Sequence, residues 1–425
     1  MFRILLRVAT PALAMAGAVA AAPGLAQAAP ANTSVPCNAG TLASDIAGAA
    51  SGATLGLAAH CTYTLTAALP AVSQNLTIKG NAATLERSSS APAFTILSVT
   101  GGTLSVSNLN FTNGRGGIAV LQSGNLSVTA GTFSGNQAPQ GGAIDMDGAE
   151  HNVTITGVTF TGNTATGKDS QGGAIYNGLN AGTTITRSTF TGNTADQGGG
   201  IFDFAVYGAS ITSSTFTGNH AQDGGAILND PIGGENLTKV TIKDNSASHD
   251  GGGIYGYSTQ VTVLNSVISG NQAGADGGGI YQRDVIGRAS SQLTSDKLTG
   301  NSAADGGALY NDVGNAAFTG STISGNRATV SGGGVENITD EYGDGAVSFG
   351  TSTVTGNQAG TDGGGVYNVG TMTATSTSLT HNTAAAGGGI YDGPGTDTVT
   401  LTTSPVQHNT PDNCEPTGSI TGCTH

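Results

Sequence analysis

Short apolar segments alternate with polar turns along most of the chain. From about residue 111 to residue 409 they recur in a unit of about 27 residues, whose clearest copy runs from Asp250 to Asn271. One apolar segment lies eight residues before an Asn, a second lies three residues before it, and a third follows a glycine pair. Segments this short, flanked by Thr and Val, favour strands over helices. The pattern therefore predicts three short strands and three turns in each repeat.

The asparagine of the repeat predicts how the units stack. It stands at positions 136, 163, 193, 219, 245, 271, 301, 326, 357, 382 and 409. A unit of this size cannot bury its own apolar face, so it has to stack on its neighbours. Stacking equivalent strands predicts an all-β fold, a parallel β-helix of three sheets that rises about 4.8 Å per rung.

The repeated positions also predict local contacts. We expect the apolar side chains to form ladders inside the solenoid. We expect the asparagines to lie at a turn, where Asn tolerates the left-handed region, and to bond their amides to one another. The glycine pairs are expected to supply positive φ.

The sequence divides into four parts. Arg3 and Arg7 precede an apolar stretch and the cleavage pattern Ala26-Gln27-Ala28, which together are typical of a secretory signal peptide. In the next part we expect a short flexible lead over 29–36 and a helix over Thr41–Ala50 that covers the first open sheet edge. The predicted parts are a signal peptide at 1–28, a cap with irregular rungs at 29–110, regular rungs at 111–410, and a C-terminal tail at 411–425.

Four cysteines flank the repeats. Cys37 and Cys61 precede them, whereas Cys414 and Cys423 follow them. Of the three possible pairings, the two local ones are favoured, because the intervening array should hold the chain ends far apart. The spacings of 24 and 9 residues lack a flanking His pattern, which argues against zinc. Two disulfides indicate an oxidising compartment.

Charge limits the classes of partner. Only 9% of residues are charged, and removal of Arg3 and Arg7 would take the formal net charge from −14 to −16. This balance excludes a general electrostatic grip on nucleic acid. Beyond the leader, no apolar segment approaches the roughly 20 residues that span a bilayer. We therefore expect an extracellular protein, secreted or associated with a cell surface and not embedded in a membrane.

The paired motifs resemble a known family. Phe160-Thr-Gly-Asn163 is followed by Gly172-Gly-Ala-Ile175, and Phe216-Thr-Gly-Asn219 by Gly224-Gly-Ala-Ile227. Over about 300 residues this pattern resembles the polymorphic membrane protein repeat. The resemblance implies a right-handed, pectate-lyase-like β-helix on secreted or surface-exposed proteins that are often linked to adhesion. Later repeats carry Ile, Leu or Val for Phe and GGG for GGA, which is typical of bacterial secreted variants without the C-terminal barrel.

Four consecutive repeats place an Asp four residues before the aliphatic residue of the glycine motif. These residues are Asp223, Asp250, Asp276 and Asp305. Like charges about 5 Å apart repel by roughly 3 kcal/mol at an effective dielectric of 20, before screening. Either Ca²⁺ bridges them, since oxygen ligands suit a hard cation, or each Asp accepts the N–H groups of the following glycines at an exposed turn.

A second row consists of tyrosines one residue after the same aliphatic position. If the aliphatic residue points inward, the tyrosine points outward and is exposed. An exposed row would stack on sugar rings, or neighbouring tyrosines would stack on each other. The row contains Tyr176, Tyr255, Tyr281, Tyr310, Tyr367 and Tyr391.

Two longer loops are the sharpest positional clue. The distance from the aliphatic residue to the next Asn is 16–19 residues in most repeats, but 21 after Ile280 and 22 after Val335. Insertions in repeat proteins often lie on the binding face. The alternative is a cross-rung ion pair of little energetic value. The candidate binding residues are Tyr281, Arg283, Asp284, Arg288, Asp340, Glu341, Tyr342 and Asp344.

No motif identifies an enzyme. The chain contains no nucleophile elbow, no zinc-binding HExxH and no phosphate loop. We therefore expect a non-catalytic protein that binds glycans, surfaces or other proteins. The alternative is a polysaccharide lyase or a glycoside hydrolase, which needs placed carboxylates or Ca²⁺ with a basic residue. Asp276, Arg283, Asp284 and Arg288 would supply these parts.

Overall fold

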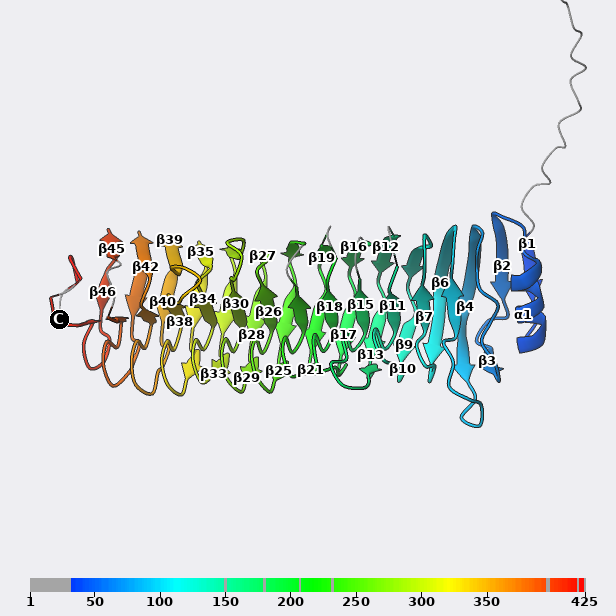
Figure 1. The fold of residues 1–425 in the computed structure, drawn as a ribbon, viewed down its shortest axis with the longest axis horizontal. Helices are drawn as coiled ribbons and strands as arrows, with labels where there is room; N and C mark the ends of the chain where they lie inside the picture. Colours follow the sequence, from blue (N-terminus) through cyan, green and yellow to red (C-terminus); the bar gives the residue numbers. More distant parts are fainter. Residues whose placement is uncertain are drawn as a thin grey trace, which may run out of the picture.

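The chain forms one long solenoid of parallel strands (Figure 1). The computed structural model describes residues 32–148, 151–178, 181–205, 208–230, 233–394, 398–418 and 420–423. The predicted signal peptide lies outside them. Within these ranges the one helix is α1, Ala39–Gly48, at the N-terminal end of the solenoid. The predicted all-β parallel β-helix is therefore confirmed.

A regular rung has four strand segments rather than three. One such rung contains β12 (His151–Thr156), β13 (Thr159–Thr161), β14 (Thr164–Ala165) and β15 (Ile175–Asn177). The segments equivalent to β12 and β13 belong to a 27-stranded sheet, and those equivalent to β14 form short separate sheets. The fourth segment has only two residues, so no apolar pattern marks it in the sequence.

The strands after the glycine pairs form a 13-stranded sheet, which carries the candidate site. Successive strands pair in parallel and in register, as Ile201 with Ile227 and Ile227 with Ile254. Its strands are β5 (Leu97–Val99), β7 (Ile118–Val120), β11 (Ile144–Met146), β15, β18 (Ile201–Asp203), β22 (Ile227–Asn229), β26 (Ile254–Tyr257), β30 (Ile280–Arg283), β34 (Leu309–Asp312), β38 (Val335–Ile338), β41 (Val366–Asn368), β44 (Ile390–Asp392) and β47 (Cys414–Glu415).

The core is a set of apolar ladders. The in-register stack places equivalent side chains directly above one another, so Phe160 and Phe190 lie with ring centroids 4.7 Å apart. The phenylalanine ladder runs through Phe111, Phe133, Phe160, Phe190 and Phe216, all with no measurable exposure. Aliphatic residues continue it from Ile242 onwards. The predicted interior ladders are confirmed.

The asparagines form a buried hydrogen-bonded ladder beside this core. The Nδ2 of Asn219 donates to Oδ1 of Asn245 over 2.9 Å, and the same oxygen accepts the backbone N–H of Asn219 over 3.0 Å. The left-handed residue is the one before each Asn, such as Gly218 or Asp244, and not the Asn itself. The expected φ of the Asn was therefore wrong, because its side chain is fixed by the ladder while its neighbour makes the turn.

The two glycines of each pair have different roles. The first has positive φ, as in Gly198 with φ of 64°. The second has no positive φ but lies against the next rung, where a Cβ on Gly199 would stand 2.3 Å from the carbonyl oxygen of Gly225. Positive φ therefore explains only half of the motif, and close approach of two rungs explains the other half.

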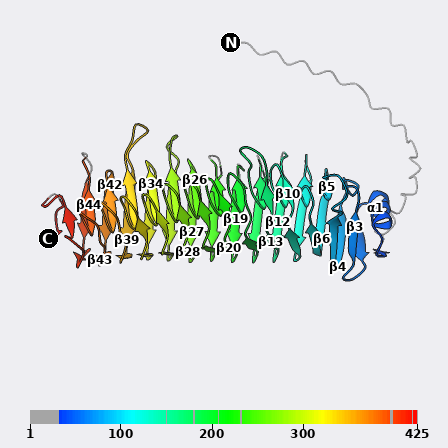
Figure 2. The same cartoon turned by 90° about the horizontal axis from the view of Figure 1, so that it is seen from below.

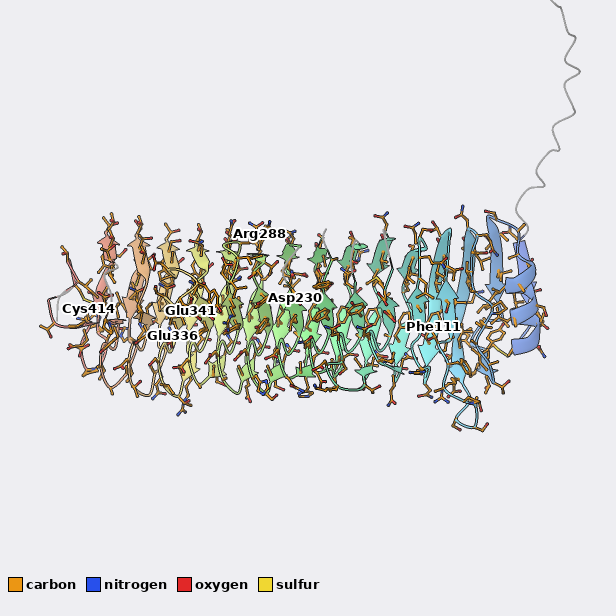
Figure 3. All side chains as sticks on the ribbon, in the orientation of Figure 1. Phe111, Asp230, Arg288, Glu336, Glu341 and Cys414 are labelled. Atoms are coloured by element: carbon orange, nitrogen blue, oxygen red, sulfur yellow. A yellow bond between two sulfur atoms is a disulfide. The ribbon has the colours of Figure 1, made fainter. Side chains whose placement is uncertain are left out.

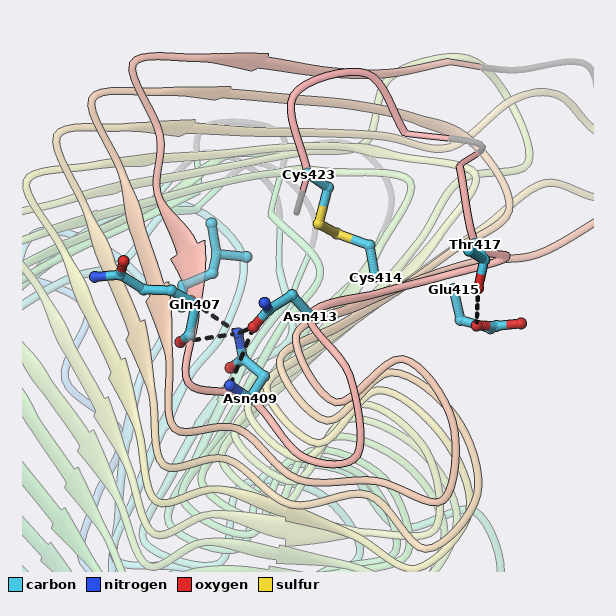
Figure 4. Close-up of a disulfide and its surroundings, with 8 residues drawn as sticks. Gln407, Asn409, Asn413, Cys414, Glu415, Thr417 and Cys423 are labelled. Carbon is cyan, nitrogen blue, oxygen red and sulfur yellow. Dashed lines mark hydrogen bonds between the residues drawn. A yellow bond between two sulfur atoms is a disulfide. The ribbon is translucent and has the colours of Figure 1, made fainter. Parts of the chain in front are cut away.

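The ends of the solenoid are tied by disulfides and short elements. Residues 32–35, expected to be a flexible lead, form β1 (Asn32–Val35), which pairs with β2 (Ala53–Leu57). The expected helix is α1, and it buries Leu42 and Ile46. The predicted pairings are confirmed as Cys37–Cys61 and Cys414–Cys423, and Figure 4 shows the second of these disulfides. The boundaries of the four parts stay predictions.

At the C-terminal end, Asn409 continues the ladder by donating its amide to Oδ1 of Asn413 over 3.2 Å, as Figure 4 shows. No helix in the described ranges is long and apolar enough to cross a membrane.

Candidate functional site

The outer surface of the 13-stranded sheet carries three positions of each repeat. They lie four residues before, one residue after and three residues after the buried aliphatic residue. Between residues 223 and 367 these positions hold mainly acids and tyrosines, and we call this set the acid–tyrosine strip. It consists of Asp223, Asp230, Asp250, Tyr255, Tyr257, Asp276, Tyr281, Arg283, Asp305, Tyr310, Asp312, Glu336, Asp362 and Tyr367.

The tyrosines of the strip stack on one another. The ring centroids of Tyr255 and Tyr281 are 4.9 Å apart, and those of Tyr281 and Tyr310 are 5.4 Å apart. Tyr281 is only 4% exposed, and the other two are half-buried. Of the two alternatives, the structure shows tyrosines that stack on each other and not an open row, since in-register strands bring the rings face to face. The faces within the stack are not available to a sugar ring, although ring edges reach the surface.

Glu336 interrupts the tyrosine row between Tyr310 and Tyr367. Burial, together with the charges of Asp305 and Asp276, raises the pKa of Glu336 to about 9. Its carboxyl group hydrogen-bonds the carboxyl group of Asp305, but Oε2 has no hydrogen-bond partner. Glu336 is therefore protonated at neutral pH and acts as a hydrogen-bond donor.

Asp312 is the second buried acid of the strip. Its Oδ2 accepts the hydroxyl of Tyr281 over 3.1 Å and lies 3.6 Å from Nε of Arg283. Its Oδ1 has no partner, and the residue is 5% exposed. Burial raises its pKa, whereas the charge of Arg283 lowers it. Arg283 thus forms its ion pair with Asp312 on the next strand of the sheet. Among the described residues, no ion pair joins the two long loops.

Three of the four aspartates of the predicted row, Asp223, Asp250 and Asp305, accept hydrogen bonds from the next rung and not from the glycines that follow them. Oδ1 of Asp223 accepts the backbone N–H of Asp250 over 3.3 Å, and Oδ1 of Asp250 accepts that of Asp276 over 3.1 Å. Oδ1 of Asp305 likewise accepts the N–H of Ser331 over 2.8 Å. These bonds offset part of the repulsion between rungs.

Proton uptake offsets a further part of that repulsion. Burial, followed by the charges of Asp250 and Asp305, raises the pKa of Asp276 to about 7. Within the described ranges, no three His, Cys, Asp or Glu side chains are grouped to hold a metal ion. The Ca²⁺ bridge stays an untested prediction.

The two long loops rise from one edge of the solenoid, in the yellow part of the chain in Figure 2. In the first loop Asp284 is 5% exposed and accepts the N–H groups of Ile286 and Ala289, so it holds the loop in shape. Arg288 is exposed and projects from the upper edge in Figure 3.

In the second loop Oδ1 of Asp340 accepts the N–H of Tyr342 over 2.6 Å. This turn presents the Tyr342 ring, which is 54% exposed. Glu341 and Asp344 are also exposed. The loop folds back toward the strip, because a Cβ on Gly343 would stand 3.1 Å from Cγ1 of Val313, the residue after Asp312.

The structure brings some of the predicted site residues together. Tyr281, Arg283, Asp276 and Asp305 all lie on the strip around Tyr310, whereas Arg288, Glu341 and Asp344 lie on the exposed loops. Sequence reasoning missed Glu336, Asp312 and Asp230. The available signal was the replacement of the tyrosine in Val335-Glu336-Asn337-Ile338.

A hollow opens where the tyrosine row gives way to Leu228. Phe202, Leu228 and Tyr255 are consecutive in the register, and the smaller Leu228 leaves a cavity of about 210 Å³. The carboxyl groups of Asp223 and Asp230 line it, and burial raises the pKa of Asp230 to about 6. Nδ1 of His249 lies 3.8 Å from Oδ1 of Asp223. The hollow therefore presents carboxyl groups as acceptors, and the side chains of Gln197, Tyr255 and Tyr257, which also line it, carry hydrogen-bond donors.

Comparison with known proteins identifies the family. The model of the right-handed β-helix region matches residues 74–323, more than half of the chain. The chain belongs to the right-handed β-helix family. The match does not extend to the polymorphic membrane protein repeat in particular, and no curated protein matches.

Two solved structures are similar to this β-helix protein in fold. One is tailspike protein 3 of bacteriophage CBA120, with 15% identity over 90% of this chain and 59% of the tailspike, and a TM-score of 0.43. The other is the PL6 family alginate lyase AlyGC, with 12% identity over 88% of this chain and 81% of the lyase, and a TM-score of 0.21. The chain thus spans 59% of the length of the tailspike. At these TM-scores neither likeness bears on function.

Proposed function

We propose that this protein binds saccharide chains along the acid–tyrosine strip, as a secreted or cell-surface β-helix. The observation that carries the proposal is a pair of nearly buried carboxyl groups with an unpaired oxygen, Oε2 of Glu336 and Oδ1 of Asp312. A buried polar atom without a partner costs about 1–3 kcal/mol. Both oxygens are buried, so a ligand hydroxyl reaches either one only after the covering side chains shift, and its bond would then recover part of that free energy.

The chemistry of the strip favours a polyhydroxylated ligand. The unpaired oxygens of Glu336 and Asp312 can accept hydrogen bonds, because the one proton of Glu336 is directed to Asp305, and the hydroxyl of Tyr310 can donate and accept. Saccharide hydroxyls also donate and accept, so they can satisfy all three groups. Because equivalent positions repeat about every 4.8 Å along the axis, the strip suits a long, linear ligand.

The exposed ring of Tyr342 supplies the apolar surface that the stacked tyrosines lack. Aromatic faces bind the apolar faces of ring-shaped ligands, and the tyrosine hydroxyl remains available to water. Asp340 holds this ring at the tip of the loop that follows Glu336. Tyr342 is therefore the residue in the second loop on which we expect a sugar ring to stack.

The proposed location rests on the sequence. The signal-peptide pattern over residues 1–28 and the two disulfides support export into an oxidising compartment. The resemblance of the paired motifs to the polymorphic membrane protein repeat supports a role in adhesion. Attachment of the exported protein to surface glycans would agree with both the export signal and the role in adhesion.

Binding of a panel of neutral oligosaccharides to the mature protein tests the proposal. For a saccharide that binds, Asp312→Asn should weaken the affinity about tenfold, since a hydrogen bond to a charged group contributes about 1.5–3 kcal/mol. Tyr342→Ala should weaken it about fivefold, since an aromatic stacking contact contributes about 0.5–1.5 kcal/mol. Asp169→Asn, at a surface position, is the matched control and should leave binding unchanged. Equal affinities for all variants, or no binding to any saccharide, would refute the proposal.

Glycosidic bond cleavage is a second candidate because of the raised pKa of Glu336. A carboxylic acid that stays protonated at neutral pH can act as a general acid. Hydrolysis also needs a second carboxylate at some distance. Asp305 is hydrogen-bonded to Glu336 and so lies too close to be the second carboxylate, which leaves Asp276 or Asp312 as candidates. Release of reducing ends by the wild type, lost in Glu336→Gln, would establish hydrolysis; retention without release would exclude it for that saccharide.

A further inference from the structure

A cavity lies at the N-terminal part of the solenoid, away from the acid–tyrosine strip. It has a volume of about 490 Å³, within the range of small-molecule sites. We call it the arginine cleft, and its polar lining consists of Arg87, Ser89, Asn113, Arg115, Gln137 and Thr166. Arg87 ends β4 (Leu76–Arg87), and Asn113 and Arg115 follow β6 (Thr103–Thr112).

Arg87 is held in the cleft by backbone oxygens. Its Nε donates to the carbonyl oxygen of Asn113 over 2.6 Å, and its Nη1 donates to that of Ala91 over 2.9 Å and to that of Ser88 over 3.1 Å. Neutral carbonyl groups fix the orientation of the guanidinium, but they do not cancel its charge. Its position is therefore set before any ligand arrives.

Arg115 is anchored through its backbone and not through its side chain. Its N–H donates to the carbonyl oxygen of Phe94 over 2.8 Å, and its own carbonyl oxygen accepts the hydroxyl of Thr95 over 2.9 Å. The guanidinium is exposed and forms no ion pair or hydrogen bond with the described residues. It is thus available to a ligand.

The charge of the cleft is opposite to that of the molecule. The chain has 13 Lys and Arg and a formal net charge of −14, yet this cavity is lined by two arginines and no carboxylate. The nearest acid in sequence, Glu86, accepts the amide of Asn113 over 3.2 Å and does not line the cavity. The arginine cleft is therefore a local positive site on an acidic surface.

A second hollow connects the cleft to the face of the 13-stranded sheet. Its volume is about 140 Å³, it shares Ala93 and Arg115 with the cleft, and it reaches Ala119 on β7 and Asp145 on β11. Burial and the charge of Asp147 raise the pKa of Asp145 to about 7. A chain lying along the outer face of the sheet would thus end near Arg115.

We propose that the arginine cleft binds an anionic substituent, a sulfate ester or a carboxylate, of a saccharide chain. Guanidinium groups bond such anions through two parallel hydrogen bonds. The saccharide part of this inference rests on the proposed function. Because the strip is acidic, a uniformly charged polymer would be repelled there. The ligand therefore combines a neutral stretch over the strip with an anionic group at the N-terminal end.

The test compares a sulfated oligosaccharide with the same oligosaccharide after desulfation, using the full mature protein at low ionic strength. The wild type should bind the sulfated form at least tenfold more tightly. Arg115→Gln should abolish this preference and leave the affinity for the desulfated form unchanged. Arg327→Gln, at an exposed position of another sheet, is the matched control and should retain the preference. Thermal unfolding verifies that each variant is folded.

Equal binding of both forms by the wild type, or a preference that survives in Arg115→Gln, would overturn the inference. A carboxylated oligosaccharide and its methyl ester, compared in the same way, determine which anion is preferred. Inorganic sulfate separates this inference from the proposed function. If sulfate binds the wild type but not Arg115→Gln, while no oligosaccharide binds, the anion site is supported and the proposed saccharide binding is refuted.

Discussion

Truncation of one asparagine in the ladder should destabilise the protein far more than truncation of an exposed one. Asn245 lies in the middle of the ladder and is 1% exposed. Its Oδ1 accepts two hydrogen bonds from Asn219, and its Nδ2 donates to the carbonyl oxygen of Phe216 over 3.1 Å and to Oδ1 of Asn271 over 2.9 Å. All four bonds are lost in Asn245→Ala.

The size of the effect follows from the groups that lose a partner. The backbone N–H of Asn219 and the carbonyl oxygen of Phe216 lose the bonds that Asn245 makes to them. Each buried group without a partner costs about 1–3 kcal/mol, so the expected loss of stability for the two groups is about 2–6 kcal/mol. Nδ2 of Asn219 keeps its bond to the carbonyl oxygen of Phe190, and Oδ1 of Asn271 keeps the backbone N–H of residue 245, which limits the loss.

Urea unfolding followed by circular dichroism measures this difference. Asn236→Ala is the matched control, since Asn236 is exposed on β23 (Glu235–Thr238) and should change stability by less than about 0.5 kcal/mol. Because each rung contacts only its neighbours, Asn245→Ala should also broaden or split the transition. Equal midpoints for the two variants would refute the view that the ladder stabilises the stack.

Two further predictions concern pH and metal. Burial raises the pKa of Glu235 well above its usual range and that of its partner Asp203 to about 6, so the stability that their protons confer is present below about pH 4 and is lost as pH rises. Glu235→Gln should flatten that pH dependence in thermal unfolding between pH 4 and 8, and an unchanged slope would contradict it. If Ca²⁺ bridges the aspartate row, 1 mM Ca²⁺ should raise the unfolding temperature of the wild type but not of Asp250→Asn; no shift in the wild type would exclude the bridge.

The architecture could be predicted from the sequence because one period determines both strand and register. Once Phe160 and Phe190 occupy equivalent positions, parallel stacking leaves their rings nowhere to lie except above one another. The same argument predicts the asparagine ladder. It does not predict which residue of the turn is left-handed, since Gly218 and Asn219 both tolerate that region and only the ladder decides between them.

The site could be predicted only in part. The alternation of apolar and polar residues predicts whether a side chain points inward or outward, but it does not predict how far neighbouring side chains bury it. Tyr281 points outward as expected, yet it is 4% exposed, since its neighbours in the stack and the flanking acid positions enclose it. The importance of Glu336 depends on Asp305 and Asp276 in the rungs before it. Such contacts form between neighbouring rungs where one residue differs from the repeat, so the repeat pattern does not predict them.

The charge state of the strip decides which ligand it can accept. If Asp276, Asp305 and Glu336 were all ionised at rung spacing, each neighbouring pair would repel by about 3 kcal/mol at an effective dielectric of 20. Burial instead keeps Glu336 protonated at neutral pH and raises the pKa of Asp276 to about 7. The strip thus presents fewer negative charges and more hydrogen-bond donors than its sequence indicates. That balance favours a neutral polyhydroxylated chain over a row of cations.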